Sequence, residues 1–430
     1  MIEVLNLFFI CCILFLIYSF PSNKFVLNKL INKNIFLSIN LNFLIITNIF
    51  FILSFFDVDL KYLFYFFLLI SLLNLFFYDF SNVKKNKILL IFFVLYVVSY
   101  SLILSSSPML EWDAAVNWIF KSINFKSGYS FKNLVNIPGV IEYPHLGTYL
   151  WAFTWKLSFI DNEYTGRIFF IFVYLISLFL VISEFKSKII IKIFILFLIL
   201  TISYDDILLS GYQEPLMFAL CIIFVYLLKN KNFKNQNSLN LLFIFLCSNL
   251  ILWTKNEGTI ILIFLSTFII LKKEISIRYK TLLILSFIFL IVLKKYIFLV
   301  YFENFFIGWK GYQFLEFQNL IQPDILIRIP YLLFQVLITF FKYPVYIIFI
   351  IAIGLSMIKY KNSFIENLSF IIFFILNISL SVAIFYFTND SNWLFHAKVG
   401  LDRILYQTSG IYWIFILGFI NRTLILKNKN

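Results

Sequence analysis

Long blocks of apolar residues, most of them about 17 to 22 residues long, limit what this chain can fold into. A helix of about 20 residues is long enough to cross the ~30 Å hydrocarbon core of a bilayer. The 430 residues are 62% hydrophobic and 13% charged, whereas soluble proteins have about 45–50% apolar and 25% charged residues. We therefore predict an all-α polytopic membrane protein.

The apolar blocks predict about thirteen transmembrane helices. Two further apolar segments, 146–158 and 330–341, are short and are expected to be interfacial or re-entrant helices. The predicted spans cover residues 4–20, 35–56, 60–78, 88–107, 164–183, 189–204, 207–228, 240–254, 258–271, 281–300, 343–358, 364–387 and 404–420.

The predicted spans divide the chain into two parts. Residues 1–87 hold three N-terminal transmembrane helices, and residues 88–430 form the remaining module. Within the second part, two predicted loops are long, namely 108–163 and 303–342. The other connections are short, and the sequence shows no repeat of fixed period.

Basic residues gather in alternate loops between the predicted spans, which the positive-inside rule assigns to the cytoplasm. They include Lys24, Lys29 and Lys33; Lys84, Lys85 and Lys87; Lys186 and Lys188; Lys229, Lys231 and Lys234; Lys272 and Lys273; and Arg422, Lys427 and Lys429. The C-terminus is then cytoplasmic and both long loops lie outside, facing the periplasm if the membrane is the bacterial inner membrane. This rule explains the net charge of +14, so we expect no nucleic-acid partner.

The longest polar stretch in the first half of the chain runs from Glu111 to His145. Glu111 and Asp113 come directly after the predicted span 88–107. Acidic side chains at the membrane end of a loop are costly unless they have a function. Asp113 is therefore a candidate functional carboxylate, but it is also a good N-cap for a helix beginning at Ala114.

Further polar residues are predicted at the same depth on the same outer face. Some could be solvated loop tips, Lys255 and Glu257 could simply pair across a turn, and Arg403 could reach lipid headgroups from a helix end. The candidates for a substrate site or second acidic site are Asp205, Asp206, Glu214, Glu257, Glu142, Tyr143 and His145.

Four short motifs, in order, resemble the GT-C superfamily of integral membrane glycosyltransferases. They are Trp112-Asp113-Ala114 after a span, Tyr143-Pro144 before a short apolar segment, Lys255-Asn256-Glu257-Gly258, and Asp402-Arg403. The resemblance covers roughly residues 88–421 and is to bacterial members of the protein mannosyltransferase and aminoarabinose transferase type. One departure is the three spans before the acidic loop, where many members have one.

The resemblance implies a helical bundle with an essential acid in its first large outside loop, followed by an interfacial helix. It also implies a sugar donor carried on a polyprenyl phosphate or diphosphate. The acid would be Asp113, with Glu111 as a substitute, because a carboxylate can accept the proton of an attacking hydroxyl. The donor phosphate would be bound by Arg403, Lys255 and Lys398, since cations bind phosphate oxygens.

Metal dependence and function class stay open at this point. Mg²⁺ or Mn²⁺ could bind Asp113 together with Asp205 or Asp206. A transporter or flippase of lipid-linked glycans would also need many spans, but it favours ionisable residues at mid-membrane and Gly- or Pro-broken helices. A polysaccharide polymerase or ligase would use a long outside loop rich in Arg and His. The acceptor could be a lipid, a glycan or a protein.

Overall fold

The computed structural model describes residues 2–19, 34–75, 81–137, 143–229, 237–302, 325–359, 364–387 and 393–427. Within these ranges the chain consists of helices and turns, without strands. The helices are α1 (Ile2–Ser19), α2 (Ile35–Leu53), α3 (Leu60–Leu75), α4 (Ser81–Ser106), α5 (Ile119–Lys126), α6 (Leu146–Lys156), α7 (Tyr164–Ser183), α8 (Ile189–Ser203), α9 (Glu214–Lys229), α10 (Asn237–Thr254), α11 (Gly258–Leu271), α12 (Ile277–Phe302), α13 (Ile325–Lys342), α14 (Val345–Lys359), α15 (Phe364–Tyr386) and α16 (Trp393–Lys427).

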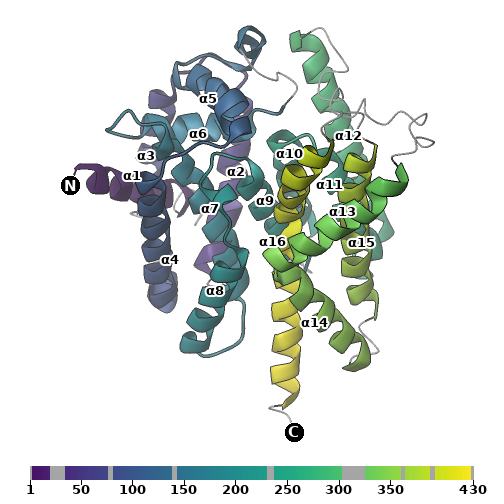
Figure 1. Ribbon diagram of the computed structural model, residues 1–430. Coiled ribbons are helices and arrows are strands. Elements are labelled where there is room, and N and C mark those ends of the chain that lie inside the picture. Colours follow the sequence, from purple (N-terminus) through teal and green to yellow (C-terminus); the bar gives the residue numbers. More distant parts are fainter. Residues whose placement is uncertain are drawn as a thin grey trace.

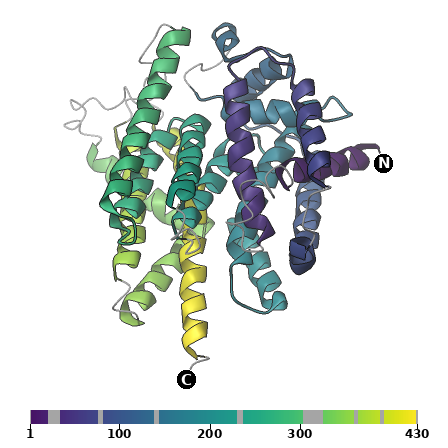
Figure 2. The same ribbon diagram turned by 180° about the vertical axis from the view of Figure 1, so that it is seen from behind.

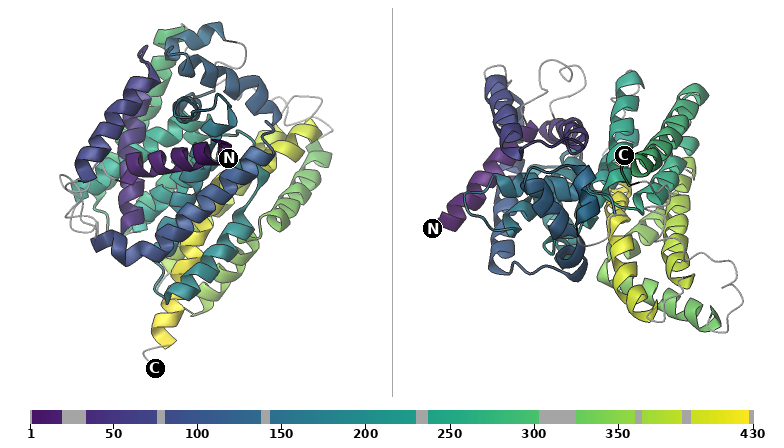
Figure 3. Two further views of the ribbon diagram at one scale, coloured as in Figure 1. Left: turned by 90° about the vertical axis from the view of Figure 1, so that its left-hand side faces the viewer. Right: turned by 90° about the horizontal axis from the view of Figure 1, so that it is seen from above.

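Three short helices complete the described chain. They are the π-helix η1 (Ala114–Trp118) and the 3₁₀-helices η2 (Phe131–Asn136) and η3 (Asp206–Leu208). The N-terminal helices α1 to α8 form one side of the molecule and α10 to α16 form the other (Figure 1). The view from above in Figure 3 separates the same two groups.

Helices α7 and α9 form the centre of the structure. Tyr164 to Ile182 of α7 are all buried, as are Glu214 to Leu228 of α9. Helix α9 packs on α7 on one side and on α16 and α10 on the other. Such all-round apolar helices are typical of the interior of a membrane bundle, and α9 joins the two groups of helices.

The all-helical apolar architecture is confirmed, but thirteen spans are not. Among the described residues, seven helices are long and apolar enough to cross a membrane, or eight if the bent pair α13 and α14 is one span. Other apolar helices have only 10–17 residues. Helices of this length suit the inside of a bundle better than a lipid-exposed crossing.

The two segments expected at the interface differ from each other. Helix α6 is enclosed by protein, because Leu146 to Trp155 are all buried and it packs between α5 and α7. The segment 330–341 lies within α13, which turns by 90° into α14. Helix α13 buries the apolar side chains of Leu332 and Val336 and exposes those of Leu333 and Phe341.

The two ends of the bundle carry different parts of the chain. Helices α5, α6 and the start of α16 lie at one end, and the α7–α8 turn and the C-terminal end of α16 lie at the other (Figure 1; Figure 2). The two basic segments at the second end were predicted to share the cytoplasmic side. Most of the predicted loop 303–342 falls outside the described residues, which resume at 325.

Candidate functional site

Four charged side chains from four separate parts of the chain form a continuous series of ion pairs. Arg403 Nη1 donates to Asp113 Oδ2 at 2.5 Å, and Arg403 Nε donates to Glu214 Oε1 at 2.6 Å. Lys255 Nζ donates to the same Glu214 oxygen at 2.9 Å. Glu257 lies 3.5 Å from Lys255 on its other side. We call Asp113, Arg403, Glu214 and Lys255 the ion cluster.

The ion cluster is buried at Glu214 and Lys255 and becomes more exposed toward Asp113. The side chain of Glu214 is 0% exposed and that of Lys255 is 4% exposed, while Arg403 is 14% and Asp113 is 28% exposed. Within the described chain, Asp113 Oδ1 and Arg403 Nη2 have no hydrogen-bond partner. The accessible end of the cluster therefore offers a carboxylate oxygen beside free guanidinium donors.

Tyr212 supports the guanidinium of Arg403 from one face. The centre of the guanidinium lies 3.9 Å from the ring centroid, within the range of a cation–π contact. Burial raises the pKa of Tyr212 to about 12, and the nearby Arg403 opposes that rise. The phenol is thus neutral at physiological pH, and its role toward Arg403 is to fix the plane of the charge.

Asp113 lies in the first turn of a helix of unusual geometry. The five residues after it form the π-helix η1, and Asp113 occupies the N-cap position without a side-chain hydrogen bond to the backbone. The carboxylate pairs with Arg403 instead, so the N-cap interpretation of this residue is not what the structure shows. Short π-helical turns are frequent at functional sites.

Two glycines bring the segment 211–214 against the start of η1. Gly211 has φ of +84°, and a Cβ there would lie 2.8 Å from Leu110 Cδ2 and 3.0 Å from Ala114 Cβ. A Cβ on Gly147 would lie 1.3 Å from Oε1 of the buried Gln213. The positive φ of Gly211 favours glycine at that turn, and a Cβ on Gly147 would displace the side chain of Gln213, the residue before Glu214.

Arg167 ties together the two loops that carry the carboxylates. This buried side chain donates from Nη1 to the carbonyls of Met109 (2.8 Å) and Leu209 (2.6 Å), and from Nη2 to the carbonyl of Pro108 at 2.8 Å. Its charge is paired with Glu163 at 2.7 Å. Burial raises the pKa of Glu163, and the contact with Arg167 limits the rise.

Sequence reasoning missed Arg167, although it stands out as a single cation inside the apolar block 164–183. A buried Arg in such a block must satisfy several donors, and backbone carbonyls of adjacent loops are the natural partners.

A second group of charges surrounds Lys342. Its Nζ lies 3.0 Å from Asp205 Oδ2 and 3.0 Å from Asp402 Oδ2. Tyr343 also donates to Asp205, at 2.7 Å, and Thr339 donates to Asp402 at 2.5 Å. Asp205 therefore joins Lys342 rather than the ion cluster, and sequence reasoning missed Lys342.

The remaining candidates lie apart from the ion cluster. Asp206 is exposed and accepts a hydrogen bond from Tyr204. Glu111 is exposed and contributes its backbone N–H to the Ser210 carbonyl at 3.2 Å. Lys398 is exposed on α16, about 140° around the helix from Arg403. Glu142 lies outside the described residues.

His145 and Tyr143 have structural contacts. His145 is fully buried, with Nε2 2.6 Å from Ser54 Oγ and its ring among Phe51, Phe131 and Trp253. Burial holds its pKa well below the usual value, with Lys121 and Lys294 acting in the same direction. The carbonyl of Tyr143 accepts from Lys121 Nζ at 2.7 Å.

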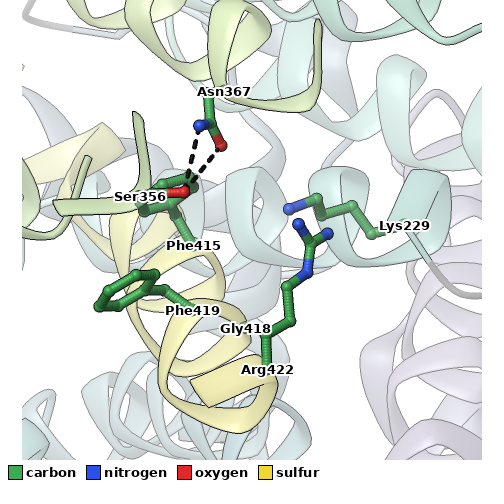
Figure 4. Close-up of a pocket in the computed structure, with 7 residues that line it drawn as sticks. All are labelled: Lys229, Ser356, Asn367, Phe415, Gly418, Phe419 and Arg422. Atoms are coloured by element: carbon green, nitrogen blue, oxygen red, sulfur yellow. Dashed lines mark hydrogen bonds between the residues drawn. The ribbon is translucent and has the colours of Figure 1, made fainter. Parts of the chain in front are cut away.

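Two further features of the described residues bear on a ligand site, namely the grouping of metal-ligating side chains and one small cavity. In the described ranges, no three His, Cys, Asp or Glu residues converge as metal ligands. Figure 4 shows a cavity of about 20 Å³ lined by Lys229, Ser356 and Arg422, with Ser356 hydrogen-bonded to Asn367. It has room for one water, and it lies at the end of α9 opposite Glu214, about 22 Å along the helix axis.

Comparisons with protein-family models, with curated proteins and with solved structures found no match for this chain.

Proposed function

We propose that this protein is a membrane glycosyltransferase of the GT-C type. It transfers a sugar from a polyprenyl-phosphate-type donor to a lipid, glycan or protein acceptor at the outer face of the membrane. The observation that carries the proposal is the contact between Asp113 and Arg403. It sets a candidate base and a candidate phosphate ligand side by side at the accessible end of the ion cluster.

The chemistry requires both groups. The acceptor oxygen forms a bond to the anomeric carbon while the bond from that carbon to the donor phosphate oxygen breaks. The acceptor proton passes to Asp113 Oδ1, and the negative charge left on the phosphate is met by the free donors of Arg403. A single displacement of this kind inverts the configuration at the anomeric carbon.

Glu214, which also pairs with Lys255, holds Arg403 in position for this step. Arg403 uses Nε for Glu214 and Nη1 for Asp113, so its outward edge is fixed before substrate arrives. Donors that are oriented in advance stabilise developing charge without reorganisation during the reaction. The buried carboxylate of Glu214 also balances the two cations that contact it.

A transporter of lipid-linked glycans is the alternative that one observation favours. Lys294 is buried within α12, a candidate span, and intramembrane cations often mark transport pathways. However, its amine donates to the Leu252 carbonyl at 2.8 Å, in the last turn of α10. This contact satisfies a helix end, so we prefer the enzyme. A polymerase or ligase stays a third alternative.

The proposal is tested by sugar transfer in membranes that express wild type, Asp113→Asn or Glu111→Gln at equal levels, supplied with labelled polyprenyl-phosphate sugars. Removing a general base costs about 10²- to 10⁴-fold in rate, so Asp113→Asn should lose that much while still binding donor. Glu111→Gln is the matched control and should keep its rate. Equal rates for Asp113→Asn and wild type would exclude Asp113 as the base.

The same membranes address the alternative. If wild type transfers sugar from none of the donors but moves a fluorescent lipid-linked glycan across the bilayer, the transporter replaces the enzyme. The proposed orientation, with a cytoplasmic C-terminus, follows from the positive-inside rule. A protease-accessible tag after Asn430, cleaved only in inside-out vesicles, would support it.

A further inference from the structure

The continuous helix from Trp112 to Lys126 consists of η1, α5 and the two residues before them. Unlike a helix of a soluble protein, it has an exposed face that is apolar. Its exposed residues up to position 123 are all apolar, namely Trp112, Ala115, Val116, Phe120 and Ile123. Its buried residues include the polar side chains Asn117, Lys121 and Ser122. A contiguous apolar surface of this kind marks a contact with lipid or with another molecule.

The apolar surface of this helix continues from that of a candidate transmembrane span. Helix α4 contains the candidate span Asn86–Ser106 and exposes Leu102 and Ile103 in its last turns. Met109, which is 79% exposed, and Trp112, which is 70% exposed, follow within a few residues. Only the short exposed segment 107–108 separates the end of α4 from the first of these two residues.

The aromatic residue at the junction has the type and position of an interface anchor. Trp is enriched where the hydrocarbon core meets the headgroups. Amphipathic helices lie in this plane with the apolar face toward the acyl chains. The opposite face packs on α6, so protein covers the side that holds the polar residues together with Trp118 and Phe125. The exposed apolar side is left open.

We infer that the outward face of residues 112–123 is covered by lipid of the adjacent leaflet, in continuity with α4. Its occupant is the apolar chain of a membrane lipid. Asp113 is then at headgroup level, at the N-terminal end of a lipid-covered helix. This inference does not require the protein to be an enzyme. Only the further idea that a lipid-linked donor approaches from this side rests on the proposed function.

The test is spin-label accessibility in the full chain reconstituted into phosphatidylcholine bilayers. Cys12, the one partly exposed cysteine of the four, is replaced by alanine, since Cys11, Cys221 and Cys247 are buried. Labels are then placed singly by Ala115→Cys, Val116→Cys, Phe120→Cys or Ile123→Cys. Ser127→Cys, on an exposed polar residue just after α5, is the matched aqueous control.

The four labels should collide more with oxygen, which concentrates in lipid, than with a water-soluble nickel chelate, and Ser127 should show the opposite ratio. Nickel access at all four positions equal to that at Ser127 would overturn the inference, because the face would be in water. Exclusion of both reagents would overturn it too, because a protein would then cover the face. Ala115→Cys changes the fewest atoms and guards against misfolding, and no outcome depends on sugar transfer.

Discussion

The fully buried carboxylate of Glu214 and the guanidinium of Arg403 are joined by a hydrogen bond of 2.6 Å between Oε1 and Nε. The same oxygen accepts from Lys255, so one atom serves two cations. The other oxygen, Oε2, is buried without a hydrogen-bond partner in the described chain. Glu214 is thus the central member of the ion cluster.

Glu214→Gln keeps the shape of the side chain but leaves Arg403 and Lys255 with excess positive charge in a buried place. Breaking a buried ion pair by removing one partner costs about 3–5 kcal/mol. We expect a loss of this size in the free energy of unfolding in detergent. Glu257→Gln is the control, since Glu257 is 20% exposed and lies 3.5 Å from Lys255, and it should change stability much less. Equal effects of the two variants would contradict the central role of Glu214.

Arg403→Lys keeps the charge but removes the planar fork of donors. A lysine cannot bind Glu214, Asp113 and a phosphate with the same geometry, and each charge-assisted hydrogen bond is worth about 1.5–3 kcal/mol. We expect binding of a short polyprenyl phosphate, followed by calorimetry, to weaken at least about tenfold. Lys398→Ala should bind like wild type, because Lys398 is exposed on another face of α16. The reverse order of effects would move the phosphate site to Lys398.

Gly147→Ala should disturb the ion cluster from a distance. The added Cβ would meet Oε1 of Gln213 at 1.3 Å, and Gln213 directly precedes Glu214. Overpacking of this kind costs about 1–3 kcal/mol, measurable as a lower midpoint of denaturant unfolding. Gln213→Ala removes the clash, so the double variant should be more stable than the sum of the two single effects. Simple additivity would show that the residues are not in conflict.

Asp57 gives a prediction about pH. Its carboxylate accepts from the Ser130 backbone N–H at 2.9 Å and pairs with Lys132 at 3.0 Å. Hydrogen bonds from Ser130 and Lys132 lower the pKa of Asp57 below its ordinary value. A lowered pKa stabilises the folded state at pH above the unfolded pKa, and this stabilisation is lost as pH falls through the folded pKa.

Unfolding midpoints of wild type and Asp57→Asn should therefore differ by a constant amount above about pH 5 and converge in stronger acid. Asp59→Asn is the control for a nearby carboxylate on the same loop. A difference that stays constant down to the lowest pH would show that the contact with Ser130 does not depend on the charge of Asp57.

The sequence predicted helix ends well where the length of an apolar block determines them. The spans predicted at 164–183 and 258–271 coincide with α7 and α11. In each case a polar group bounds the block, such as Glu163 before α7 and Lys272 after α11. Length and polarity are local properties, so they can be read without knowing the packing.

The side-chain partners could be predicted only in part. Depth along the membrane normal placed Asp113, Glu214, Lys255 and Arg403 at one level, and the structure joins them. Depth in the membrane does not determine how a helix is rotated about its axis or which helices are neighbours. The prediction from depth therefore also included Lys398 and a site that combines Asp113 with Asp205. The contact of Asp205 with Lys342 depends on the 90° turn between α13 and α14, which no local pattern encodes.

The hydrogen bond between Asp113 and Arg403 spans 290 positions of sequence. At a synthesis rate of about 5–20 residues per second, the ribosome needs roughly 15–60 s to pass from one residue to the other. During that interval Glu214 and Lys255 can already pair, but Asp113 has no cation from α16. The site is thus completed only when the last helix enters the bundle, and a chain that stalls before α16 cannot form it.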